Sequence, residues 1–210
     1  TIRKETLKNL ARKNGSRTTD TQIDAFYIRG EKPVGVLHIF RELENHILQA
    51  PDDFRRIAYE YLEDASLKRV RHAEFFWNPT GTIAATDLSY SELPNAILVG
   101  MNEAEQDFGI TSLLIPSIDR EASASAGLEM VELMCAHHHS AVVGIGLDYN
   151  EVNNPPEKFF DAYTLAKKSG LKTTAHAGEF GTPWKNVETA IDVLGIDRLD
   201  HAYTILDNPI

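Results

Sequence analysis

Cysteine is almost absent from this 210-residue sequence, which contains only Cys135. One thiol excludes an internal disulfide framework and a cysteine-based metal cluster within the chain. Long apolar runs are also lacking, since none approaches the roughly 18 residues of a membrane span. The first residues do not resemble a signal peptide. We therefore expect a cytoplasmic protein with no membrane partner.

Basic residues are outnumbered, with 21 lysines and arginines against 31 aspartates and glutamates and a formal net charge of -10. This charge repels polyanions, and no basic patch offsets it, so a nucleic acid partner is not expected. The composition is 42% hydrophobic and 25% charged, which is typical of a globular protein with a sizeable core.

Helical and strand patterns alternate along the chain. Apolar residues recur at helical spacing over residues 2–10, 36–48 and 51–68. Five strands are predicted, at 70–77, 111–116, 141–147, 171–176 and 198–203, with helices between them at 90–108, 122–135, 156–169 and 183–194. This alternation indicates βαβ units and a parallel sheet.

Two parallel architectures fit such a pattern. A doubly wound sheet would carry a glycine-rich turn after its first strand, and this sequence has none. A TIM-like (β/α)8 barrel needs eight strands, and only five are predicted. The α/β fold expected is therefore a partial barrel, forming one domain over residues 1–210 that is incomplete at both ends.

Two successive predicted strands end in a histidine, where a barrel gathers its catalytic groups. His176 ends one strand, and Gly178 leaves room for a substrate before Glu179 begins the loop. His201 ends the next strand beside Asp200, which could orient a ligand. A neutral imidazole can bind zinc, and a shielded carboxyl group can donate a proton at neutral pH. These residue types predict a metal-assisted hydrolysis.

Each residue alone also has a structural interpretation. A single histidine at a strand end is often only hydrogen-bonded, and a lone glutamate is usually a solvated loop residue. Recurrence on two strands favours the catalytic interpretation. By contrast, we expect residues 137–139, a run of three histidines, to be a solvated helix end, and Asp119-Arg120 to form a surface ion pair.

The sequence His176-Ala177-Gly178-Glu179 resembles the HAGE motif of the zinc-dependent adenosine and adenine deaminases. Residues 198–203, RLDHAY, are similar to the R-[IL]-x-H-G-[YV] strand of the same family. The resemblance extends over nearly the whole chain, because residues 2–7, 70–76 and 143–148 also resemble segments of that family.

This resemblance implies a hydrolase that cleaves a C–N bond of a cyclic amidine, with one zinc ion (Zn2+) in each active site. It implies that His176 binds the zinc, that Glu179 protonates ring nitrogen N1 of a 6-aminopurine, and that His201 deprotonates or orients the attacking water. Tyr149 and Gly178 are expected to contact the substrate, a small purine nucleoside or base.

The segment 146–151, GLDYNE, bears on substrate choice. Adenosine deaminases resemble D-L-A-G-D-E here and adenine deaminases G-L-D-S-S-E followed by two prolines, so Tyr149 fits neither and Pro155-Pro156 favours adenine. We nevertheless expect adenosine as the substrate, because more of the family is named for adenosine deamination. Adenine is the alternative. Ala202 stands where the family usually has glycine.

The remaining zinc ligands of the family, an H-x-H pair and an Asp-Asp pair, fall outside these 210 residues. The isolated polypeptide is therefore expected neither to hold zinc tightly nor to turn over. Two other functions stay open, namely a different metal hydrolase on the same barrel and an inactive relative that only binds.

Overall fold

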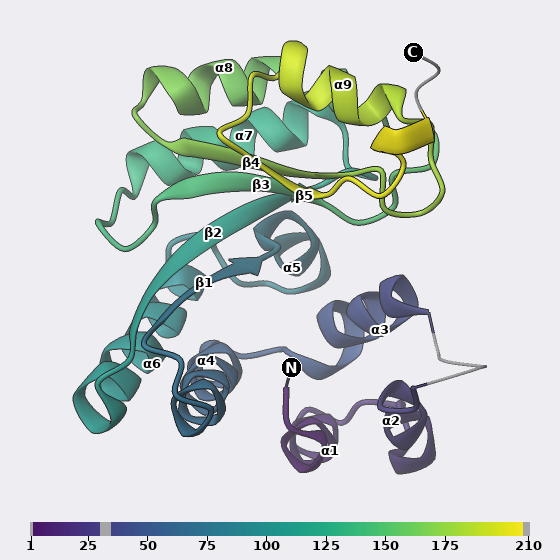
Figure 1. Ribbon diagram of the computed structural model, residues 1–210. Helices are drawn as coiled ribbons and strands as arrows, with labels where there is room; N and C mark the ends of the chain where they lie inside the picture. The colour runs from purple at the N-terminus through teal and green to yellow at the C-terminus, as the bar shows by residue number, and fades with distance from the viewer. Residues whose placement is uncertain (1, 30–34, 208–210) are drawn as a thin grey trace. The chain divides into compact units, whose positions relative to one another are not determined.

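The computed structural model describes residues 2–29 and 35–207. Five strands form one sheet in the order β1-β2-β3-β4-β5, so neighbours in the sheet are also neighbours along the chain (Figure 1). The strands are β1 (His72–Trp77), β2 (Thr111–Asp119), β3 (Gly144–Asp148), β4 (Lys172–Ala177) and β5 (Arg198–His201). The pairs β2–β3, β3–β4 and β4–β5 run parallel. The predicted partial barrel with parallel strands is confirmed.

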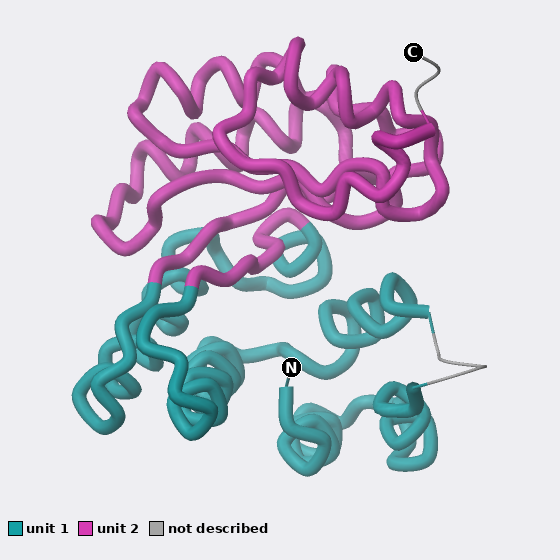
Figure 2. The backbone as a smooth tube through the Cα atoms, viewed as in Figure 1, with its two compact units in different colours: residues 1–73, 81–112 teal, residues 74–80, 113–210 magenta. Residues whose placement is uncertain are grey.

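The chain divides into two compact units (Figure 2). The first contains residues 1–73 and 81–112, and the second contains residues 74–80 and 113–210. The single domain expected over residues 1–210 stays a prediction.

Helices dominate the first unit. They are α1 (Lys4–Lys13), α2 (Asp20–Phe26), α3 (Val36–Glu42), α4 (Pro51–Leu67), α5 (Pro79–Ala85), which begins in the second unit, and α6 (Glu92–Phe108). The predicted helix 36–48 is split, since α3 gives way to a π-helix at Leu43–Ile47. α2 and α5 were not predicted because each has seven residues, too few for a clear apolar period. None of the helices described is long and apolar enough to span a membrane.

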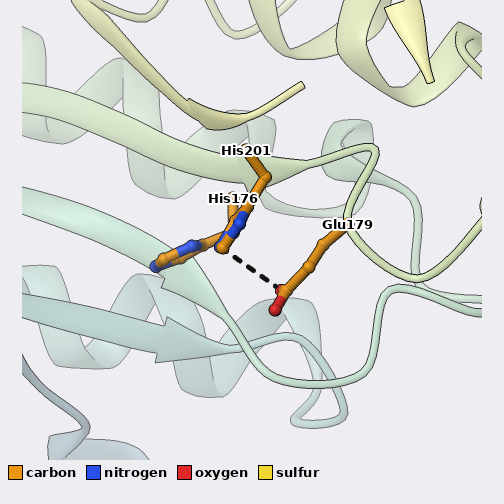
Figure 3. A group of neighbouring side chains, drawn as sticks. All are labelled: His176, Glu179 and His201. Carbon is orange, nitrogen blue, oxygen red and sulfur yellow. Dashed lines mark ion pairs between the residues drawn. The ribbon is translucent and has the colours of Figure 1, made fainter. Parts of the chain in front are cut away.

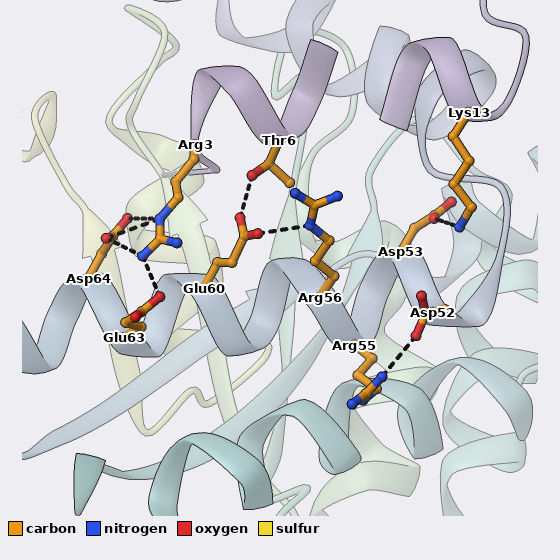
Figure 4. Close-up of polar contacts among 10 residues, drawn as sticks. All are labelled: Arg3, Thr6, Lys13, Asp52, Asp53, Arg55, Arg56, Glu60, Glu63 and Asp64. Atoms are coloured by element: carbon orange, nitrogen blue, oxygen red, sulfur yellow. Dashed lines mark hydrogen bonds and ion pairs between the residues drawn. The ribbon is translucent and has the colours of Figure 1, made fainter. Parts of the chain in front are cut away.

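Polar contacts join α1 to α4 within this unit (Figure 4). Arg3 donates to both Glu63 and Asp64, each at 2.7 Å. The buried Asp53 carboxylate pairs with Lys13 at 2.6 Å and also accepts the backbone N–H of Ala50 at 3.0 Å. Asp53 therefore caps the start of α4 while it holds the end of α1.

The second unit carries α7 (Ala124–Ala136), α8 (Phe160–Lys168) and α9 (Lys185–Asp192), which cover one face of β3, β4 and β5 (Figure 1). The core between these layers is fully buried and includes Ile118, Ile145, Ala175, Val131, Tyr163 and Val187. The helix predicted at 156–169 begins with a 3-10 turn, Pro156–Phe159, before α8. β2 continues past its predicted end because residues 117–119 pair with β3.

Candidate active site

Four polar side chains lie at one level of the sheet, at the carboxyl ends of β2 to β5. Asp119 pairs in register with Asp148, and His176 pairs with Asp200. Gly144 pairs with Lys172, which places Asp148 level with His176 as well. The carboxyl ends of parallel strands are where barrel enzymes gather their catalytic groups.

His176, Glu179 and His201 converge at this edge (Figure 3). One potential ligand atom from each lies within 4.8 Å of the other two. The imidazole rings of His176 and His201 have centroids 4.7 Å apart, and Nε2 of His201 lies 3.5 Å from Oε2 of Glu179. The structure therefore brings together the three residues that the sequence singled out for metal binding and proton transfer.

His201 reaches this cluster through an unusual backbone conformation. Its register partner on β4 is Ala177, so a regular strand would point His201 away from the face that carries His176. The φ angle is +72° at His201 and +59° at Ala202, both in the left-handed region that residues other than glycine seldom adopt. This turn ends β5 and lets the imidazole lie beside that of His176.

The environment of His176 favours the neutral imidazole. Burial lowers the pKa of His176 to about 4, with the nearby charge of Asp200 acting in the opposite direction. The ring of Phe76 lies against it with centroids 5.1 Å apart. Among the residues described, Nδ1 of His176 is buried without a hydrogen-bond partner. A neutral imidazole with an unused ring nitrogen fits a zinc ligand.

The pKa of Glu179 is raised above that of an ordinary surface glutamate. Burial raises its pKa, and the charge of Glu151 adds to that rise, while His201 opposes it. The carboxyl side chain is 23% exposed, so it remains within reach of a small molecule. A raised pKa is what a carboxylic acid needs in order to donate a proton near neutral pH.

Gly178 lies between His176 and Glu179 in the chain, and Tyr149 directly follows β3. Gly178 has φ +72°, and an added Cβ would lie 2.7 Å from Oγ1 of Thr204 and 2.8 Å from Cγ2 of Val187. The turn before Glu179 therefore requires glycine. Tyr149 also has a left-handed φ, +66°, directly after β3, and is 7% exposed. The expectation that these two residues contact substrate stays a prediction.

Asp200 lies on the same face as His176. Thr174 Oγ1 donates to Oδ2 of Asp200 at 2.5 Å, and Arg198 Nε lies 3.4 Å from its Oδ1. These contacts fix the carboxylate in place. The three histidines at 137–139 are exposed after the end of α7, as predicted.

Arg120 corrects the sequence interpretation. The expected surface ion pair with Asp119 is wrong, because Arg120 is 0% exposed and Asp119 is 5% exposed. The Arg120 guanidinium donates to the carbonyl of Asn154 at 2.9 Å and to the carbonyl of His176. Residue type and strand-end position gave no signal for these contacts, because both acceptors are backbone atoms far along the chain.

Glu151 is the second residue that sequence reasoning missed. Its carboxylate is 2% exposed and accepts the backbone N–H groups of Gly178 at 2.9 Å and Glu179 at 3.0 Å. Asn186 Nδ2 donates to it as well, at 3.0 Å. Burial opposes ionisation of Glu151, but the two backbone hydrogen bonds, a hydrogen bond from Thr182 and the charge of Arg120 together lower its pKa.

Comparison with known proteins places this arrangement in a family. The family model described as adenosine deaminase matches residues 1–209. A curated adenine deaminase of Marinomonas sp. (strain MWYL1) is 38% identical over 156 residues, which cover 74% of this chain and 46% of that protein. The chain thus spans about half the length of this curated relative.

Solved structures agree with the sequence match. A Burkholderia ambifaria amidohydrolase with bound zinc is 55% identical, with a TM-score of 0.96 over 99% of this chain and 57% of that one. An adenine deaminase from Arthrobacter aurescens is 30% identical, with a TM-score of 0.87 over 99% of this chain and 63% of that one. From the strand-end cluster, the matched family model and these relatives, the chain belongs to the adenosine deaminase family.

Proposed function

We propose that this chain contributes to the active site of a zinc-dependent enzyme that hydrolytically deaminates a 6-aminopurine. The observation that carries the proposal is the convergence of His176, Glu179 and His201 at the carboxyl ends of β4 and β5. Relatives named as adenine deaminases and a relative with bound zinc support the same activity.

The residues present fit a zinc ion. His176 would hold it, because burial keeps its imidazole neutral and Nδ1 has no partner among the residues described. Bound zinc would supply an activated water by lowering the pKa of that water towards roughly 7. His201 lies beside His176, where its imidazole would orient this water or accept its proton.

Glu179 would act as the proton donor. Burial raises its pKa and so favours the protonated carboxyl group, and this proton would go to N1 of the purine ring. Protonation at N1 relieves the negative charge that builds up on the ring as water adds at C6. The proton accepted by His201 would pass to the amino group, which leaves C6 as ammonia, and the hydroxyl proton would return to Glu179 as the C6 carbonyl of the 6-oxopurine forms.

We favour adenine as the substrate over adenosine, which was the first expectation from the sequence. The curated relative and the Arthrobacter aurescens structure are both named as adenine deaminases. The buried Tyr149 follows β3 in the segment where adenosine deaminases resemble D-L-A-G-D-E, and its ring would occupy space that a ribose needs. Pro155-Pro156 also follows the adenine pattern.

The test is ammonia release by the full-length, zinc-loaded protein on a panel of adenine, adenosine, AMP and N6-methyl-AMP. We expect the highest kcat/KM with adenine and about one zinc per chain by metal analysis. A higher kcat/KM with adenosine would restore the first expectation from the sequence. No ammonia from any of the four compounds would overturn the purine assignment.

A further inference from the structure

Two buried side chains of opposite charge hold the backbone around the proposed catalytic residues. Arg120 follows β2 and Glu151 follows β3, and neither is more than 2% exposed. Their hydrogen-bonding atoms contact the chain at residues 176, 178 and 179 through backbone groups. Neither belongs to the cluster formed by the side chains of His176, Glu179 and His201.

Glu151 fixes the turn that carries Glu179. One carboxylate oxygen accepts the N–H of Gly178 and the side-chain N–H of Asn186, and the other accepts the N–H of Glu179. Two consecutive backbone donors are thus satisfied by a single charged acceptor in a buried place. Such charge-assisted hydrogen bonds are shorter and stronger than neutral ones.

These hydrogen bonds fix the backbone conformation of the turn, and that conformation sets the direction of the Glu179 side chain. Gly178 has φ +72°, and the direction of the Glu179 side chain depends on the backbone angles of these two residues. A carboxylate that accepts hydrogen bonds from both N–H groups selects one orientation of the peptide between them. The Glu179 carboxyl group is thereby held where its oxygen lies 3.5 Å from Nε2 of His201.

Arg120 acts on the preceding residue of the same segment. Its guanidinium donates to the carbonyl of His176, at the end of β4, and to the carbonyl of Asn154. Asn154 in turn donates through Nδ2 to the carbonyl of Asn150, next to Glu151. The two charges attract each other, so each offsets part of the energy needed to bury the other.

We propose that Glu151 is a positioning residue that sets the backbone of Gly178 and Glu179 and so aims the Glu179 carboxyl group, while Arg120 anchors the strand end of His176. The kinetic part of this inference rests on the proposed function. The geometric part does not, since it concerns only which buried carboxylate protects two backbone N–H groups.

The decisive variant is Glu151→Gln, which keeps the size of the side chain. Its amide group can accept one backbone N–H but must present its own NH2 group to the other. The matched control is Glu188→Gln on α9, where the carboxylate forms a surface ion pair with Lys185. Both variants are made in the full-length protein and assayed with adenine.

We expect kcat of Glu151→Gln to fall about 10- to 100-fold while KM changes less than about threefold, as for loss of charge-assisted hydrogen bonds that act on a catalytic group. Zinc content should stay unchanged, and Glu188→Gln should match the wild type. A fall in zinc content or in folded protein that accounts for the whole loss would overturn the positioning role.

Hydrogen exchange of the backbone amides tests the geometry without any activity. In Glu151→Gln, protection of the Gly178 and Glu179 amides should fall at least about tenfold, whereas the amides of β4 before residue 176 should keep theirs. Unchanged protection at residues 178 and 179 would overturn the proposal. If the wild type is inactive on every purine, the proposed function fails, and this measurement still decides the inference.

A second variant covers the case in which Glu151→Gln does not fold. Asn186→Ala removes one side-chain donor to Glu151 and leaves both backbone bonds in place. We expect a smaller loss of amide protection at Gly178 and Glu179, about two- to fivefold. The lost hydrogen bond holds the Glu151 carboxylate and does not itself involve these amides. A uniform loss of protection throughout β4 would contradict a local positioning role.

Discussion

Nε2 of His201 lies 3.5 Å from Oε2 of Glu179, although a regular strand would point His201 to the other face of the sheet. The contact depends on two consecutive left-handed residues at the end of β5. Backbone strain of this kind costs on the order of 1–3 kcal/mol at each residue and is concentrated at functional sites. The position of His201 is thus maintained by the surrounding fold against a local preference.

Replacing Ala202 tests this strain. Ala202→Gly should raise the free energy of unfolding by about 0.5–1 kcal/mol, because relief of the left-handed strain exceeds the added entropy of the unfolded chain. Ala202→Val should lower it by more than about 1 kcal/mol, since a β-branched side chain tolerates positive φ poorly. Denaturant unfolding of the two variants provides the measurement. Equal stabilities would show that the turn is not strained in solution.

Glu179→Gln tests the proton donor. Glutamine cannot donate the proton to the purine ring, so kcat with adenine should fall about 100- to 10,000-fold, the usual contribution of general acid catalysis. Zinc content should remain that of the wild type. A variant that keeps more than a tenth of the wild-type kcat would remove Glu179 from this role.

The raised pKa of Glu179 also predicts the pH dependence of the wild type. Burial stabilises the protonated form, and in the proposed mechanism the protonated form is the donor. The value of kcat/KM should therefore decline as pH rises through this raised pKa. A pH profile that rises throughout on the alkaline side would contradict the assignment of Glu179 as acid.

Neutral His176 predicts a loss of stability in acid. Burial lowers its pKa from the ordinary 6.5 to about 4, so the unfolded chain takes up a proton at a higher pH than the folded chain. This contribution to stability is complete above about pH 6.5 and is lost as pH falls towards 4. Urea unfolding of the metal-free, full-length protein over this range measures it.

Two histidine variants test whether His176 causes this pH dependence of stability. His176→Asn should weaken the dependence of stability on pH between 6.5 and 4, because the titrating group is gone. His138→Asn removes an exposed imidazole and should leave the dependence unchanged. Identical pH dependence in both variants and the wild type would contradict a buried, neutral His176.

Two glycines in the same loop form a matched pair. Gly178 and Gly181 both have positive φ, but a Cβ at Gly181 would meet nothing within 4 Å, whereas one at Gly178 would crowd Thr204 and Val187. Gly181→Ala should cost about 1 kcal/mol of stability from strain alone, and Gly178→Ala about 2–4 kcal/mol from strain and crowding together. Denaturant unfolding measures both, and equal losses would contradict the crowding.

The sequence predicted the sheet well because its information is local. Five apolar strands alternate with amphipathic helices, which indicates a parallel sheet, and the lack of a glycine-rich turn favours a barrel, in which the strands follow chain order. His176, Glu179 and His201 could also be identified from the sequence, because each stands close to a predicted strand end. The parallel register brings the carboxyl ends of β4 and β5 together, and the left-handed turn at His201 then completes the convergence.

The supporting residues could not be predicted in the same way. Arg120 contacts a carbonyl 56 residues away, and Glu151 contacts an N–H 27 residues away. Burial of these charges depends on backbone partners that exist only after the sheet has formed, and any residue type could provide them. The left-handed turn at His201 was hidden for a similar reason, since neither histidine nor alanine marks positive φ as glycine does.

The single level shared by Asp119, Asp148, His176 and Asp200 has an evolutionary consequence. Below that level the strands supply the side chains on which folding depends, whereas at it they supply polar groups joined to loops. Mutation can therefore exchange the groups at the strand mouths one at a time while the scaffold persists. New substrate preferences can arise on this barrel through such single exchanges, without a new architecture.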